Sequence, residues 1–122
     1  MGDNKKTERT AAVLAVLETL KSELDEQLVQ EAAGLIRANG LHVAVAFWLS
    51  RGEKGRTLVR ALCRWWGRCP DTSVLWPGGM ETSKNISIKV LDSLLALEPR
   101  QAEILAEEAE VFLTELKYAM AS

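Results

Sequence analysis

The sequence is poor in the side chains that nucleophilic enzymes use. His42 is the only histidine among 122 residues, and the chain contains just two cysteines. Nucleophilic catalysis needs an activated side chain and a base, whereas a lone histidine in an apolar segment is more often a hydrogen-bonded core residue. Glycine-rich phosphate loops, HExxH motifs, aspartate-rich metal loops and CxxC pairs do not occur. We therefore predict a non-enzyme with no catalytic residue, no metal and no cofactor.

Hydrophobic runs long enough to cross a membrane are also lacking. The longest apolar run, residues 41–49, is interrupted by His42 and is too short for a bilayer. The N-terminus has no apolar core of the kind that secretory signals carry. Without such a signal we expect no disulfide between Cys63 and Cys69, and their spacing matches no zinc site. The expected location is the cytoplasm, with no membrane partner.

Helical periodicity is present along nearly the whole chain. Apolar side chains recur at steps of three and four between residues 8 and 38, which predicts one long helix or two with a break near Asp25. Asn39-Gly40 is a typical helix C-terminus, since glycine tolerates the positive φ often found there. Residues 41–50 are apolar almost all round, a pattern that indicates a central, buried helix.

Further helices are predicted over about 54–66, 85–97 and 99–120. Residues 67–84 are rich in proline and glycine and are predicted to form a loop. Residues 1–7 are expected to be disordered. The length suits a single domain over residues 1–122, so the predicted fold is all-α, a compact single-domain bundle of five to six helices.

Charge is distributed unevenly along the chain. The formal net charge is only −2, yet residues 34–68 carry seven basic side chains against the single acidic Glu53. The segments on either side are net acidic. Such a polarised chain points to a partner for its basic segment.

Within that segment, four arginines fall on one side of the predicted helix. Successive residues advance about 100°, so Arg56, Arg60, Arg64 and Arg68 (the arginine row) share an arc of about 120°. A separate arc is apolar and is predicted to face the core; it holds Leu58, Val59, Leu62, Cys63 and Trp66. Like charges four residues apart repel, so the row needs compensation from outside. The candidate RNA-binding residues are the arginine row with Arg51 and Lys54 in the preceding turn.

Several partners suit an exposed row of arginines. Arginine presents a fork of donors suited to phosphate, and a row gives sequence-independent, salt-sensitive affinity for nucleic acid. Alternatively the row is a solvated face paired with acidic residues elsewhere, such as Glu103, Glu107 and Glu108, or it binds an acidic protein. A helical DNA-binding regulator with residues 54–68 in the major groove is a further alternative, but its basic face is almost purely arginine, with little asparagine, glutamine or serine to read bases.

The four tryptophans have different expected environments. Trp48 and Trp66 are predicted to lie in the core, because both fall among apolar neighbours. Trp65 lies at the edge of the apolar arc, where exposure and base stacking are more plausible. Trp76 precedes Pro77 in the loop and is either an anchor for the loop or a contact for a partner.

Two segments resemble a known family. The run "LIRANGLHVAVAFWLSRG", residues 35–52, resembles the signature of the small subunit of type III-B (Cmr) CRISPR effector complexes, the Cmr subunit five family. The matching positions are Ile36, Asn39, Gly40, Leu41, Ala46, Phe47 and Leu49. The C-terminal "EEAEVFLTELKYAMA" is similar to the family's last helix through Glu108, Ala109, Phe112, Leu113, Leu116 and Lys117. Ala106 and Glu115 depart from the threonine and tryptophan expected in that helix.

The resemblance implies a non-catalytic subunit of an antiviral ribonucleoprotein. Several copies would stack head to tail into a minor filament beside other CRISPR effector subunits, along the guide RNA and the target RNA. Binding would be independent of sequence, since base pairing reads the sequence and the protein holds the backbone. Successive copies of one basic helix would then form a continuous track for the RNA, and acidic helices would meet basic surface on the next copy.

Overall fold

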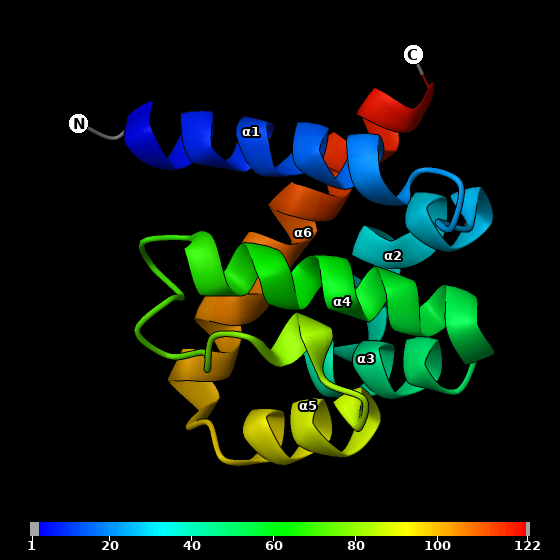
Figure 1. The fold of residues 1–122 in the computed structure, drawn as a ribbon. Helices are drawn as coiled ribbons and strands as arrows, with labels where there is room; N and C mark the ends of the chain where they lie inside the picture. Colours follow the sequence, from blue (N-terminus) through cyan, green and yellow to red (C-terminus); the bar gives the residue numbers. More distant parts are fainter. Residues whose placement is uncertain (1–2, 122) are drawn as a thin grey trace.

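A computed structural model describes residues 3–121, with side chains from residue 5 onward, and within them every regular element is helical. The elements are α1 (Asp3–Leu20), α2 (Glu26–Asn39), α3 (Leu41–Leu49), α4 (Gly52–Arg68), the short 3-10 helix η1 (Met80–Thr82), α5 (Ile86–Leu95) and α6 (Pro99–Ala121). Figure 1 shows α4 crossing in front of α6, with α1 along the top and α5 along the bottom of the bundle. The predicted all-α bundle is confirmed.

The break between the first two helices lies where the sequence placed one. The Asp25 carboxylate accepts a hydrogen bond from the backbone N–H of Leu28 (3.0 Å) and caps α2. Gly40 ends α2 with a φ of 87°, and its N–H donates to the carbonyl of Ile36, which confirms the predicted helix end. The expected disorder of residues 1–7 is wrong for residues 3–7, because α1 begins at Asp3 and the Lys5 ammonium binds carboxylates of the body. Residues 1 and 2 lie outside the described residues.

The predicted loop 67–84 is shorter and better anchored than expected. Gly67 and Arg68 belong to the last turn of α4, which corrects the predicted boundary. Thr72 donates from its hydroxyl to the carbonyl of Trp66 (2.7 Å). Trp76 is buried against Trp66, with ring centroids 4.8 Å apart. Trp76 is therefore an anchor that pins the loop to α4, one of the two roles considered.

Helix α4 lies at the centre of the core and packs against α1, α3, α6 and η1. Trp48 and Trp66 are buried as predicted, and the Trp66 indole N–H donates to the carbonyl of Leu105 (3.1 Å). The expected exposure of Trp65 is wrong, because α6 covers that side of α4 and Phe112 stacks on the Trp65 ring at 5.9 Å. A Cβ on Gly55 would overlap the carbonyl of Trp48, so glycine permits the close approach of α4 to α3.

Helix α3 is less buried than its apolar sequence predicts. One side packs into the core, but Val43, Ala46 and Phe47 remain exposed. The prediction of a fully buried helix is therefore wrong for its outer side, since α2 and α5 flank the helix and nothing in the described chain covers it. His42 is half-buried, and its Nε2 lies 3.0 Å from the carbonyl oxygen of Leu94, the structural hydrogen bond expected of a lone histidine.

Candidate nucleic-acid interface

The arginine row forms the solvent face of α4. Neighbouring helices cover the rest of the α4 surface, so only the arc that carries the row reaches solvent along most of its length. Arg64 and Arg68 are exposed, and Arg56 and Arg60 are half-buried. The structure thus places the four side chains together, as the helical spacing predicts.

Two members of the row are paired with carboxylates at the surface. Arg56 Nη2 lies 2.9 Å from Glu53 Oε2 one turn earlier on α4, and Arg68 Nη2 lies 3.2 Å from Glu8 Oε2 on α1. The hydrogen bond from Arg56 holds the pKa of the Glu53 carboxyl below its usual value, and the charge of Arg60 lowers it further. Exposed pairs of this kind contribute little to stability, because solvent screens both charges. A phosphate can therefore replace these carboxylates at small cost.

Arg60 and Arg64 differ sharply from each other. Arg60 donates from Nη1 to the carbonyls of Glu81 (2.8 Å) and Ser83 (2.9 Å), so it holds the segment after η1 against α4. Arg64 makes no hydrogen bond or ion pair with any side chain or backbone group that the structure describes. Arg60 is thus partly a structural residue, whereas Arg64 has its full hydrogen-bonding capacity available.

A groove of about 540 Å³ runs between α4 and the start of α5, and we call it the α4–α5 groove. It is lined by Glu53, Arg56, Arg60, Lys84, Asn85, Ser87 and Ile88. Lys84 is exposed and, like Arg64, has no partner among the described residues. Sequence analysis missed Lys84 because it lies 24 positions beyond Arg60; only the folding of residues 69–84 back onto α4 brings the two together.

Arg51 and Lys54 lie at the start of α4, apart from the row, and their predicted assistance in RNA binding stays a prediction. Both line a different cavity, between α2 and α3. The Arg51 guanidinium lies 5.6 Å from the centroid of the Phe47 ring, and Lys54 Nζ lies 3.9 Å from the Asp25 carboxylate. The six predicted residues therefore separate into two groups on different sides of α4.

The acidic residues considered as partners for the row lie elsewhere. Glu103 and Glu107 are exposed on α6 with no ion pair to the row. Glu108 is buried and binds Arg9 (3.0 Å) and Lys5 (3.0 Å). The prediction that these three glutamates neutralise the charge of the arginine row is therefore wrong.

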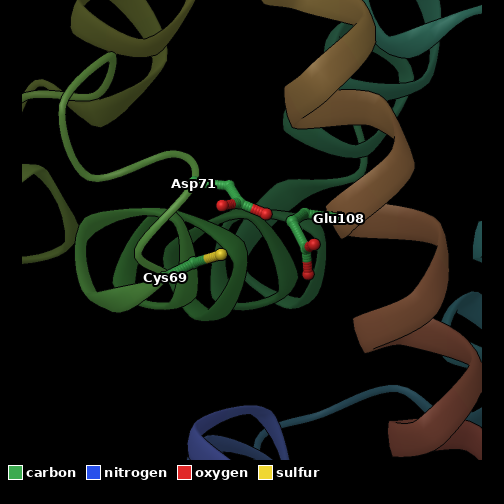
Figure 2. Close-up of side chains that lie close together, drawn as sticks. All are labelled: Cys69, Asp71 and Glu108. Carbon is green, nitrogen blue, oxygen red and sulfur yellow. The ribbon is translucent and has the colours of Figure 1, made fainter. Parts of the chain in front are cut away.

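Cys69, Asp71 and Glu108 lie together where the loop meets α6, as Figure 2 shows. The Cys69 sulfur, one carboxylate oxygen of Asp71 and one of Glu108 all lie within 4.8 Å of one another, a separation that suits a metal ion. Lys5 Nζ lies 2.7 Å from Asp71 and 3.0 Å from Glu108, and these bonds raise the pKa of the ammonium. The lysine thus supplies the positive charge that a metal would bring. Cys63 and Cys69 are separate buried thiols, and burial raises the pKa of Cys63 to about 12.

Comparison with known proteins leaves the family open. No protein-family model matches the chain, and neither a curated protein nor a solved structure matches it. Within residues 3–121, none of the helices combines the length and the hydropathy needed to span a bilayer.

Proposed function

We propose that this chain is a non-catalytic small subunit of a type III-B (Cmr) CRISPR effector complex in the cytoplasm. In this role it holds the guide and target RNA backbone, stacks with further copies of itself and contacts other effector subunits. The proposal rests on the resemblance of residues 35–66 and 99–121 to that family together with the basic surface of α4. RNA contacts are assigned to the arginine row and to Lys84.

The observation that carries the RNA-binding part is a basic surface with unused donors. The row spaces its side chains about 6 Å apart along the helix. Two cations have no partner within the described chain: Arg64, in the row, and Lys84, which lines the α4–α5 groove. Guanidinium and ammonium groups bind phosphate oxygens without reading bases. A surface of this kind favours a polyanion over an apolar ligand.

Two other functions are alternatives to RNA binding, and experiment can distinguish them from it. A helical DNA-binding regulator would use α4 in a major groove, but asparagine and glutamine, which pair with adenine, are absent from α4. A protein adaptor would use the same basic surface for an acidic partner. Both predict that guide RNA does not co-purify with the protein.

The first experiment is a gentle pull-down of the tagged protein from its native cell, with RNA sequencing and mass spectrometry of the bound material. Short RNAs sharing a repeat-derived end, together with large CRISPR subunits, are the expected result. Protein free of RNA at low salt would overturn the proposal, and sequence-selective DNA would favour the regulator.

A double variant, Arg64→Glu with Lys84→Glu, then tests the contact surface. It avoids Arg60, whose replacement would also release the carbonyls of Glu81 and Ser83. We expect target RNA capture by the assembled complex to fall at least tenfold at low salt, because two phosphate contacts per copy become repulsive. The matched control is Arg100→Glu with Lys117→Glu, the same charge change at two exposed α6 positions that have no partner among the described side chains. Equal capture by both variants would remove RNA binding from this surface.

A further inference from the structure

The second basic pair, Arg51 and Lys54, borders a groove that the arginine row does not explain. A charged cavity of about 220 Å³ is lined by Asp25, Gln27, Leu28, Glu31, Phe47, Arg51 and Lys54. An adjoining cavity of about 270 Å³ is mostly apolar and is lined by Leu28, Glu31, Leu35, Phe47 and Trp48. Because the two cavities share Leu28, Glu31 and Phe47, they form one continuous depression, which we call the α2–α3 groove.

The apolar part of this groove suits a planar aromatic ligand. Phe47 is 43% exposed although it belongs to the most apolar helix of the protein. The Arg51 guanidinium already lies near the ring, at 5.6 Å from its centroid. Exposed aromatic rings beside arginine are the platforms on which proteins stack unpaired bases.

The charged part of the groove contains cationic groups and one anionic group that are free to bind a ligand. Arg51 makes no ion pair among the described residues, and Lys54 is only weakly held, 3.9 Å from Asp25. Asp25 is already committed, because it caps α2 through Leu28. Glu31 is exposed, has no partner within the described part of the chain and lines both cavities.

We propose that the α2–α3 groove binds a single unpaired ribonucleotide. The base lies on Phe47 in the apolar cavity, the phosphate lies near Arg51 and Lys54, and Glu31 accepts a hydrogen bond from the ribose 2′-hydroxyl between them. Arg51 and Lys54 line only the charged cavity, whereas Phe47 and Glu31 line both cavities. The lining that faces the base is apolar, so the base is not read, whereas the carboxylate selects ribose over deoxyribose. The inference rests on the proposed function in one respect only: the nucleotide is taken to come from an unpaired position in the bound RNA.

The test is a titration of the full chain with adenosine 5′-monophosphate and with its 2′-deoxy analogue, followed by amide chemical shifts in NMR. We expect shifts confined to α2, α3 and the first turn of α4, with the deoxynucleotide bound about tenfold more weakly, as the loss of a hydrogen bond to a charged group predicts. Glu31→Ala should bring the two affinities to about the same value.

Phe47→Leu removes the ring but keeps an apolar side chain, and it should weaken binding of both nucleotides about tenfold or more. The control is Val43→Ala, an exposed position one turn earlier on α3 that lines neither cavity; it should leave the affinity unchanged. Equal binding by wild type and Phe47→Leu, shifts along the arginine row alone, or no shift at about 10 mM nucleotide would each overturn the inference.

This experiment separates the inference from the proposed function. The Arg64→Glu, Lys84→Glu double variant should bind the mononucleotide as wild type does, because neither residue lines the α2–α3 groove. Loss of mononucleotide binding in that variant would mean that the phosphate is held by the α4 surface and would overturn the groove assignment.

Discussion

Arg9 and Arg64 carry the same functional group and occupy opposite environments. Arg9 lies between α1 and α6 with 11% of its side chain exposed; it binds Glu108 through Nε (3.3 Å) and Nη2 (3.0 Å) and lies 5.9 Å above the Trp65 ring. Arg64 lies on the outer face of α4 in solvent, without a partner among the residues that the structure describes. A charge that is already neutralised in the fold stabilises it, and a charge that is not neutralised remains available to a ligand.

The difference has an energetic cause. Glu108 is only 7% exposed, so removing its arginine would leave a carboxylate poorly solvated. Around Arg64 the solvent screens the charge, so its removal costs the fold little. Substitutions near Arg9 should therefore lower stability, whereas substitutions near Arg64 should weaken RNA binding. The expected effect on the free energy of unfolding decreases from Arg9 to Arg64.

The largest loss is expected for Arg9→Met. Glu108 would keep only Lys5 as a partner, and Trp65 would no longer have a cation over its ring. We expect the free energy of unfolding in urea to fall by about 3 kcal/mol. Lys6→Met is the control on the same helix, at an exposed position with no partner in the described structure. It should change the free energy of unfolding by less than about 0.5 kcal/mol. A near-neutral Arg9→Met would show that the buried pair does not stabilise the fold.

Arg60→Met should have an intermediate effect on the free energy of unfolding. Like Arg9 this side chain bonds to the fold, and like Arg64 it lies in the arginine row. Two carbonyls, those of Glu81 and Ser83, would lose their donor, at a cost of about 1–2 kcal/mol. Hydrogen exchange of the amides around η1 should become faster, while those of α6 keep their protection. Unchanged exchange around η1 would contradict the clamping role of Arg60.

The contribution of Lys5 should depend on pH in a defined direction. Its pKa in the folded protein is raised above the ordinary value of 10.5, so its stabilisation is fully present below about pH 10.5 and is lost as the pH rises further. Because the Lys5 side chain is 37% exposed, we expect Lys5→Met to cost only about 0.5–1 kcal/mol at pH 8. The difference from wild type should shrink above pH 10.5; a difference that grows there would reverse the assignment.

Arg64→Ala should change stability least and RNA binding clearly. The free energy of unfolding should stay within about 0.5 kcal/mol of wild type. In the assembled complex, the slope of log affinity for target RNA against log salt should become shallower by about one for each phosphate that Arg64 neutralises in the wild type. A slope equal to that of wild type would mean that Arg64 touches no phosphate.

The helices themselves were largely predictable from the sequence. Periodic apolar side chains and the glycine at Gly40 are local signals, and they predicted the helices and the end of α2. A break near Asp25 was one of two interpretations of residues 8–38, and the cap made by the Asp25 carboxylate is seen only in the structure. Errors occurred where the outcome depended on a distant segment. Trp65 is buried because α6 lies over it. Residues 3–7 belong to a helix whose Lys5 side chain binds Asp71, 66 positions further along the chain.

The same division applies to the candidate sites. Spacing alone placed Arg56, Arg60, Arg64 and Arg68 on one face, since helix geometry is set by neighbours within a few residues. The pairing of Arg68 with Glu8, the bonds from Arg60 to the segment after η1 and the grouping of Lys84 with the row were decided only by the tertiary structure. Those interactions join segments far apart in the chain, and their strength depends on burial, which no local pattern encodes. The sequence by itself thus determined which residues could share a face, and packing decided which of their charges are neutralised and which remain available to a ligand.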